Sequence, residues 1–355
     1  MESSYQHYYL SVFNKIDLSN HECLEGELNN ILEANSKYSG TTTTKNEIND
    51  LLISKYIEEV WISELSDRCE GVDKPTITDY LVETKGLVRP YEKDIDIRLW
   101  TKLRNIYFAL KQYLIPDEEE YEYDFIKRKK PVRVILSVDL IKQIHSIIGK
   151  DIIEDAGSFR KKNVCGLSSS VIYATAKTIP ERLEELIYFF NSMITEVNEE
   201  DRDRDRDQRK KDRLLFMIAL GSFFFSEFLL IHPFINGNGR TARILLNYIL
   251  QSEVSFPFSI YLDGGDRDRC GVGGDRDRCG RRKYLDAVEK RNYDKHPTEI
   301  TKYILHACNR SASIINWVST SNGMATSNAM DDTDIRSMNN PLHSINSNDN
   351  NLSRK

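Results

Sequence analysis

The chain has 355 residues, with 49 Lys and Arg against 55 Asp and Glu, and its net charge of −6 excludes a broadly basic nucleic-acid-binding protein. Hydrophobic residues make up 40% and charged residues 29%, and only 9 Pro and 17 Gly are present, which excludes a collagenous or wholly disordered chain. This length can bury a substantial core in one large domain or two modest ones.

Cysteine usage and the N-terminal sequence bear on the cellular compartment. The six cysteines are scattered and form no Cys-x-x-Cys pair, which favours a reduced chain over a disulfide or zinc framework. The N-terminal segment lacks a basic stretch followed by an apolar one, so we expect no secretory signal. The sequence therefore predicts an intracellular, cytoplasmic protein.

Apolar residues recur at three- and four-residue steps in successive segments, which predicts amphipathic helices. The predicted helices span 47–65, 78–82, 95–114, 137–148, 179–197, 283–291 and 299–318. Ser137 is expected to cap the fourth of them and Gly149 to end it, and Pro180 suits the first turn of the fifth. The β-branched and small polar residues of 157–178 predict a short hairpin.

The segment 214–231, LLFMIALGSFFFSEFLLI, is apolar nearly all round and as long as a membrane span. Ser222, Ser226 and Glu227 interrupt it, and a polar loop follows at once, so we interpret it as the central core helix of a helical domain. The alternating charges of 201–213 nearly cancel, which is typical of a solvated linker or helix extension rather than a nucleic-acid-binding arm.

The chain divides into three predicted parts. Two copies of GGDRDRCG fill residues 264–280 and predict an expanded low-complexity loop, because a repeat architecture needs at least three units. Residues 319–355 are rich in Ser and Asn and predict a disordered tail. The remaining parts are an N-terminal helical region over 1–94 and a core over 95–318, into which the loop is inserted.

The most informative segment, HPFINGNGRTAR at 232–243, lies between the apolar helix and a second helical pattern, RILLNYIL. Pro233 is expected to end the first helix beside His232, and the glycines at 237 and 239 make a tight turn into the next helix. A helix N-terminus entered in this way binds anions, because its free N–H groups and its dipole point at the same place. The sequence thus predicts a phosphate site next to a histidine.

Two arginines and the histidine give this site its predicted chemistry. Arg240 and Arg243 are three residues apart and therefore neighbours on one face of the second helix, where their guanidinium groups can hold further phosphates. His232 is suited to act as a general base, because the ordinary pKa of histidine is about 6.5. A histidine that only caps a helix is the alternative, and the fixed spacing of all these residues favours the functional interpretation.

HPFINGNGRTAR closely resembles the signature of the Fic family, H-P-F-x-[D/E]-G-N-[G/K]-R-x-x-R. The resemblance extends over roughly 95–261, where a helix, AG-F-R, a flap, IPERLEELIYFFN, the apolar helix and the motif follow in the same order. It implies a mainly α fold, a Fic-type helical bundle with a small β-hairpin flap. Fic proteins most often transfer AMP from ATP to a hydroxyl side chain of another protein, so the resemblance implies a protein adenylyltransferase.

The resemblance also implies a role for each motif residue. His232 would deprotonate a Ser, Thr or Tyr hydroxyl, which attacks the α-phosphorus as pyrophosphate leaves. Arg240 would contact the β-phosphate and Arg243 the γ-phosphate, while Phe234 would anchor the loop by packing. The segment 161–174 would be the flap that holds an extended stretch of the target by strand addition. The anion hole would consist of Gly237, Asn238 and Gly239.

The chain departs from the family at the fifth motif position, where Asn236 stands in place of the usual Asp or Glu ligand of Mg²⁺. An amide oxygen can bind Mg²⁺ or Mn²⁺ but carries no charge, so weaker metal binding is expected. Two hypotheses stay open: an adenylyltransferase that uses ATP with Mg²⁺ or Mn²⁺, and a catalytically weakened nucleotide-binding regulatory module. A Fic relative that transfers a different phosphate-containing group is a variant of the first.

Upstream, SDRCEG at 66–71 resembles the inhibitory pattern [S/T]-x-x-x-E-[G/N] of one class of Fic proteins, on a helical segment predicted at about 47–71. The matching positions are Ser66, Glu70 and Gly71. The resemblance implies that Glu70 pairs with Arg243, displaces the γ-phosphate and keeps basal activity low. In some relatives the same glutamate serves the removal of AMP, so reversal is also open here.

The expected partner is a target protein docked on the flap, and a homodimer stays open. Nucleic acid is not expected, because both DRDR runs have nearly balanced charge and no interleaved aromatic residues. No membrane partner is expected either.

Overall fold

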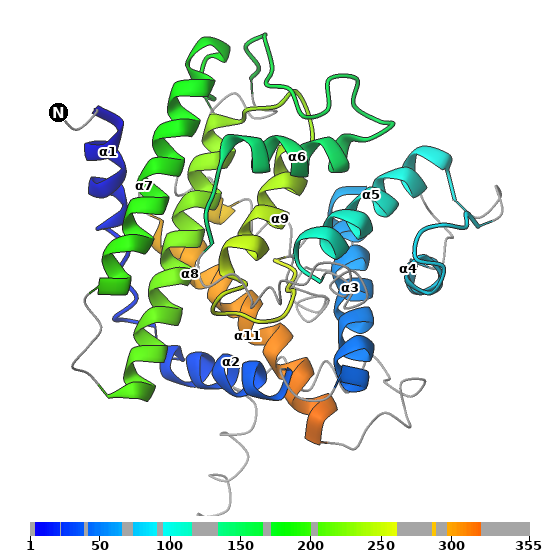
Figure 1. The fold of residues 1–355 in the computed structure, drawn as a ribbon, viewed down its shortest axis with the longest axis horizontal. Helices are drawn as coiled ribbons and strands as arrows, with labels where there is room; N and C mark the ends of the chain where they lie inside the picture. The colour runs from blue at the N-terminus through cyan, green and yellow to red at the C-terminus, as the bar shows by residue number, and fades with distance from the viewer. Residues whose placement is uncertain are drawn as a thin grey trace, which may run out of the picture.

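The computed structural model describes residues 4–21, 23–38, 42–65, 74–90, 95–115, 134–165, 172–199, 205–260, 286–288 and 297–320. Within these ranges the chain is mainly helical, which confirms the predicted fold class (Figure 1). The elements are α1 (Ser4–Phe13), α2 (Leu24–Tyr38), α3 (Thr42–Leu65), α4 (Lys74–Glu83), α5 (Ile97–Tyr113), α6 (Val138–Gly149), the short 3-10 helix η3 (Ala176–Thr178), α7 (Ile179–Glu199), α8 (Arg206–Ile231), α9 (Asn238–Leu250) and α11 (Thr298–Thr320).

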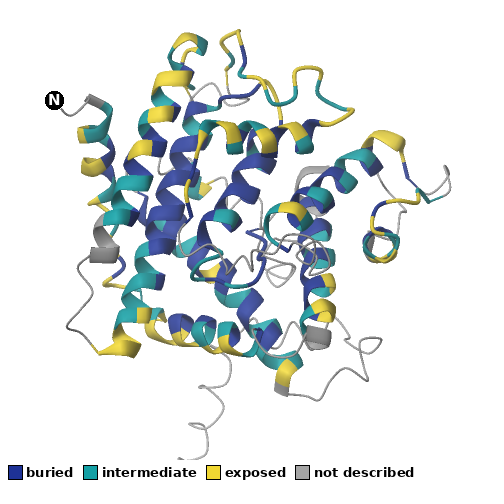
Figure 2. Cartoon of the chain, in the orientation of Figure 1, coloured by how far each residue is buried: buried dark blue, intermediate teal, exposed yellow. Residues whose placement is uncertain are grey.

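Helices α8 and α9 pack against each other at the centre of the bundle, and the other helices surround them (Figure 1). Helix α7 lies along α8, α6 packs on α9, and α11 contacts both α8 and α2. Figure 2 shows that most residues of α8 and α9 are buried, whereas the exposed residues lie on the outer faces of the surrounding helices. The loop that joins α8 to α9 therefore starts and ends at the two central, buried helices.

Helix α8 is, among the described helices, the one long and apolar enough to cross a membrane. Most of its apolar stretch, 78%, is buried inside the protein, in agreement with the predicted core helix. The helix begins earlier than the apolar run, because the side chain of Asp205 accepts the N–H groups of Asp207 and Gln208 at 3.2 Å each and so caps it. Part of the charged run 201–213 is therefore a helix extension.

Helix α6 has the boundaries that the sequence predicts. The Ser137 hydroxyl accepts the N–H of Leu140 at 3.1 Å, which satisfies one of the unpaired donors of the first turn, and the helix ends at Gly149. Helix α5 packs on α6 and is capped in the same way by Asp96. Both helices also pack on α9, the helix that follows the α8–α9 loop.

Helices α1 and α2 were not predicted from the sequence. Helix α1 packs on α7 through the buried Tyr9, whose ring lies 5.9 Å from those of both Phe189 and Phe223. Helix α2 packs on α11, where Glu27 bonds His306 at 2.9 Å. Helices α1 and α11, the first and last of the described helices, thus both pack against the core, α1 on α7 and α11 on α8.

Some predictions fall wholly or partly outside the described residues. An antiparallel bridge joins Cys165 to Ile172, while residues 166–171 of the predicted flap are not described. The loop 264–280 and the tail beyond 320 also lie outside the described residues. The three-part division of the chain stays a prediction.

Candidate functional site

The α8–α9 loop brings the predicted motif residues together. His232 is the C-cap of α8, in the left-handed conformation with φ 49°, and its N–H donates to the Phe228 carbonyl at 2.9 Å. Gly237 is the N-cap of α9 with φ 79°, a backbone conformation that favours glycine. The loop between these two caps is only a few residues long, so the histidine and the N-terminus of α9 lie at the same end of the bundle.

The loop is held from inside by Phe234 and Asn238. The Phe234 N–H donates to Asn238 Oδ1 at 2.9 Å, and Asn238 Nδ2 donates to the Phe234 carbonyl at 2.8 Å. The Phe234 ring is buried and stacks on the His145 ring at 3.6 Å and 5°. The structure thus gives Phe234 the packing contacts of an anchor, and it gives the Asn238 side chain a role in bracing the loop.

Arg160 joins the loop to the base of the flap. Its Nε donates to the His232 carbonyl at 2.7 Å, its NH1 to the Lys162 carbonyl at 2.9 Å and its NH2 to the Ala174 carbonyl. Its own N–H also donates to the Pro233 carbonyl at 2.9 Å. Sequence reasoning placed this residue in the AG-F-R pattern but gave it no role, because a single arginine shows nothing about the distant carbonyls it binds.

His232 is half-buried and has the chemical form of a base. The ring of Tyr173, at the end of the flap, stacks on it with centroids 3.9 Å apart and 19° between the planes. Burial lowers the pKa of His232 to about 4, opposed by the Leu229 backbone and assisted by the charge of Arg160. The imidazole is therefore neutral at physiological pH and able to accept a proton.

The N-terminus of α9 has the features of a phosphate site. Its first helical bond runs from the Thr241 N–H to the Gly237 carbonyl at 3.0 Å, and Gly237 supplies no side-chain cap. The preceding N–H groups of the first turn, those of Asn238 and Gly239, have no intrahelical acceptor. Together with the positive end of the helix dipole, such groups favour a bound anion.

Both predicted phosphate-binding arginines are buried. Arg240 is 9% exposed and Arg243 is 1% exposed. They line a narrow cavity, too small to hold a water molecule, together with residues of α3 and α5. The lining residues are Tyr56, Val60, Ile106, Arg240, Arg243 and Ile244. Helix α3 therefore covers the arginine side of the site.

Asn236 was the predicted metal ligand, and its side chain makes a local contact. It is exposed, and its Oδ1 accepts the N–H of Gly237 at 2.7 Å. The described part of the chain contains no cluster of three or more His, Cys, Asp or Glu able to hold a metal ion. Among the described residues, Asn236 thus offers Mg²⁺ one neutral and already hydrogen-bonded oxygen, too little to hold a resident ion by itself.

The predicted inhibitory residues Ser66, Glu70 and Gly71 lie outside the described residues. Helix α3, which precedes them directly, ends at Leu65. On the flap, Ile172 is 90% exposed at the paired edge next to Tyr173. The two ends of the predicted flap therefore border the histidine side of the site.

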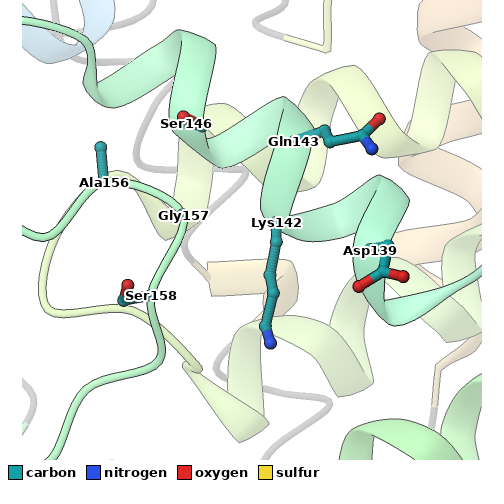
Figure 3. Close-up of a pocket in the computed structure, with 7 residues that line it drawn as sticks. All are labelled: Asp139, Lys142, Gln143, Ser146, Ala156, Gly157 and Ser158. Atoms are coloured by element: carbon teal, nitrogen blue, oxygen red, sulfur yellow. The ribbon is translucent and has the colours of Figure 1, made fainter.

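A separate surface hollow of about 340 Å³ lies between α6 and the loop that follows it (Figure 3). Its lining residues are Asp139, Lys142, Gln143, Ser146, Ala156, Gly157 and Ser158. None of the motif residues line it. Its wall does include Gly157, whose N–H donates to His145 behind it at 2.8 Å.

Comparison with known proteins agrees with the resemblance. Residues 135–250, which contain α6 to α9, match the model of the Fic/DOC family. Members of that family are commonly adenylyltransferases or other nucleotidyl or phosphate transferases. No curated protein matches the chain.

Solved structures show the same fold over a longer range. A Fic domain containing signaling protein from Bacteroides thetaiotaomicron VPI-5482 is 15% identical, with a TM-score of 0.53 over 82% of this chain and 97% of that one. Fic-1 from C. elegans is 16% identical, with a TM-score of 0.56 over 90% of this chain and 83% of that one. At these identities the likeness concerns the fold, and it extends well beyond the region of the family match.

Proposed function

We propose that this protein is a protein adenylyltransferase that transfers AMP from ATP to a Ser, Thr or Tyr hydroxyl of a target protein and is inhibited by its own Glu70. The proposal rests on one observation. A short loop joins the half-buried, neutral His232 at the end of α8 to the N-terminus of α9, the helix that carries Arg240 and Arg243. A base next to a site for several phosphates suits the transfer of a nucleotidyl group.

In the proposed reaction His232 takes the proton of the acceptor hydroxyl, the hydroxyl oxygen bonds to the α-phosphorus, and the bond to pyrophosphate breaks. The backbone at Gly237, Asn238 and Gly239 stabilises the phosphate oxygens. Arg240 and Arg243 contact the β- and γ-phosphates and stabilise the charge of the leaving pyrophosphate. Mg²⁺ or Mn²⁺ enters with ATP as part of the substrate, held mainly by phosphate oxygens, with the Asn236 oxygen as the available protein contact.

The proposed inhibition acts on the phosphate side of the site. Helix α3 lies over Arg240 and Arg243, and the chain continues from its end into the segment that contains Glu70. A carboxylate that pairs with Arg243 would take the place of the γ-phosphate. We propose that ATP binds productively only after Glu70 has moved away from Arg243. Replacement of Glu70 should therefore reveal the activity. Reversal, the removal of AMP from the target, stays open.

The proposed partner is a target protein whose extended segment pairs with the flap 161–174, and the exposed Ile172 at its described edge supports a docking role. We place the protein in the cytoplasm and leave a homodimer open. We propose neither nucleic acid nor membrane as a partner.

The second candidate is a nucleotide-binding regulatory module without significant catalysis. The observation in its favour is Asn236, which brings no charge and whose oxygen already accepts the Gly237 N–H. Transfer of a different phosphate-containing group is the variant of the first proposal. The neutral His232 favours an active enzyme over the binding module, because binding alone has no need of a base.

Intact-protein mass spectrometry tests the proposal without knowledge of the target. Wild type, Glu70→Gly and Glu70→Gly/His232→Ala are incubated with ATP and Mg²⁺ or Mn²⁺. We expect a mass gain of one AMP in Glu70→Gly that is absent in wild type and lost without His232. A gain that appears only after Asn236→Asp is added would support the binding module, and no gain in any variant would reject AMP transfer by this chain to itself.

A further inference from the structure

His145 is a buried residue outside the motif that contacts the site on three sides. It lies on α6, and its ring stacks on Phe234 at 3.6 Å. Its Nδ1 accepts the N–H of Gly157 at 2.8 Å, and its Nε2 lies 2.9 Å from the carbonyl oxygen of Asn236. One side chain therefore connects α6, the loop after it and the motif loop.

These two partners determine which ring nitrogen of His145 carries the proton. A backbone N–H can only donate, so Nδ1 must be unprotonated where it meets Gly157. A carbonyl can only accept, so Nε2 must carry the hydrogen that it donates to Asn236. The neutral Nε2–H tautomer satisfies both contacts.

The bond to the Asn236 carbonyl has a consequence for the next N–H. That carbonyl belongs to the same peptide unit as the N–H of Gly237, and a trans peptide is planar with its C=O and N–H pointing in opposite directions. Holding the carbonyl on the His145 side therefore turns the Gly237 N–H to the opposite side, where it donates to Asn236 Oδ1 at 2.7 Å and closes the turn into α9. The fit is close, because a Cβ atom added at Gly237 would lie 3.3 Å from His145 Nε2.

We propose that His145 is a positioning residue for the phosphate site: its Nε2–H holds the Asn236 carbonyl and thereby fixes the turn at Gly237, which sets the direction of the Asn238 and Gly239 N–H groups in the first turn of α9. The inference rests on the proposed function in that ATP is taken as the ligand. His145 touches neither the nucleotide nor the acceptor, and it acts through the orientation of one peptide unit.

Two substitutions separate positioning from simple filling of the core. His145→Phe keeps a flat ring against Phe234 and removes both hydrogen bonds, whereas His145→Gln supplies an amide donor and an amide acceptor. Asn105→Leu is the matched control, because the buried Asn105 side chain also holds backbone carbonyls, those of Ile148 and Lys150, at the C-terminal end of α6 about one turn beyond His145.

The measurement is the Kd for ATP by calorimetry on the full chain carrying Glu70→Gly. We expect His145→Phe to raise the Kd about tenfold, His145→Gln to recover at least part of this loss, and Asn105→Leu to leave the Kd within about twofold while lowering the Tm. A tenfold rise in Kd corresponds to about 1.4 kcal/mol, the size expected when hydrogen bonds to a charged group are misaligned. A Kd unchanged in His145→Phe, or raised equally in His145→Gln and in Asn105→Leu, would overturn the proposal.

A ¹⁵N NMR spectrum of the histidine side chains of the full chain supplies a test that needs neither activity nor a variant that folds. We expect the Nε2–H tautomer for His145, and the Nδ1–H tautomer would overturn the assignment. If the Glu70→Gly protein binds ATP but gains no AMP, AMP transfer by this chain to itself is rejected while the Kd comparison still decides the role of His145. If it binds no ATP, positioning of nucleotide phosphates by His145 is rejected.

Discussion

The histidine side and the arginine side of the motif are covered by different parts of the chain. His232 is half-buried, and its neighbours Arg160 and Tyr173 belong to the region 135–250 that matches the Fic/DOC family. Arg243, by contrast, is almost fully buried beneath α3, which lies outside that region. The motif thus has one side built within the region 135–250 and one side closed by α3.

The difference indicates where control can act. The described contacts of the histidine side are hydrogen bonds to backbone carbonyls and ring stacking within the region 135–250. Under the proposed function, α3 would have to move before three phosphates could reach the guanidinium groups on the arginine side. We therefore propose that α3 is placed to regulate the entry of the nucleotide rather than the assembly of the base.

Replacement of Arg160 should disrupt the histidine side most strongly. Arg160→Met keeps much of the buried volume but leaves the carbonyls of His232, Lys162 and Ala174 without their donor. Because buried acceptors without a partner are costly, we expect the free energy of unfolding to fall by about 3 kcal/mol. Urea unfolding measures it, with Arg98→Met at an exposed position of α5 as the control. Equal stability of the two variants would mean that the histidine side does not depend on Arg160.

Loosening α3 should open the arginine side. Tyr56 is buried and lines the cavity at Arg240 and Arg243, so Tyr56→Ala removes part of the cover. If the substitution destabilises the state in which α3 covers the two arginines by about 1.4 kcal/mol, relative to the state in which they are accessible, the apparent Kd for ATP falls about tenfold. Leu52→Ala is the control, because Leu52 is also buried on α3 but does not line that cavity.

Calorimetry with ATP decides between local uncovering and general loss of stability. We expect both variants to unfold at lower temperature and only Tyr56→Ala to bind ATP more tightly. Tighter binding by Leu52→Ala to the same extent would show that α3 acts through its overall stability and not through its cover over the arginines.

The pH dependence should identify the base on the histidine side. Burial lowers the pKa of His232 to about 4, and a general base works in its unprotonated form, so activity is present above that pKa and is lost as the pH falls through it. For the Glu70→Gly protein we expect kcat/KM to stay nearly constant from pH 7.5 to 5.5. A histidine with an ordinary pKa of about 6.5 would instead lose about tenfold over this range, so that result would contradict the assigned environment of His232.

The sequence predicted those parts of the fold and site that depend on local patterns. Ser137 and Gly149 bound α6 as expected, because caps and helix ends are encoded within a few residues. The apolar run of α8 and the glycines at 237 and 239 located the motif loop for the same reason. The position of His232 at the end of α8 follows from Pro233, its neighbour in the chain.

The parts that the sequence did not predict depend on contacts between distant residues. Helix α2 has a polar sequence, and it is held by α11, where Asn30 Nδ2 bonds Asn309 Oδ1 at 2.6 Å across 279 residues of chain. Arg160 and His145 bind carbonyls 72 and 91 residues away, and no local spacing marks either of them. The Asn238 side chain braces the loop, which only the folded loop reveals.

The smallest predicted effect concerns Tyr173, which stacks on the imidazole of His232 at 3.9 Å. Stacking of this kind contributes about 0.5–1.5 kcal/mol, so in the Glu70→Gly background we expect Tyr173→Ala to lower kcat about threefold. Tyr173→Phe keeps the ring and should retain the parent rate. Single-turnover transfer of AMP measures both variants. A loss shared by Tyr173→Phe would show that the phenol hydroxyl matters rather than the stack, and an unchanged KM for ATP is expected throughout because Tyr173 lies on the histidine side, away from the arginines.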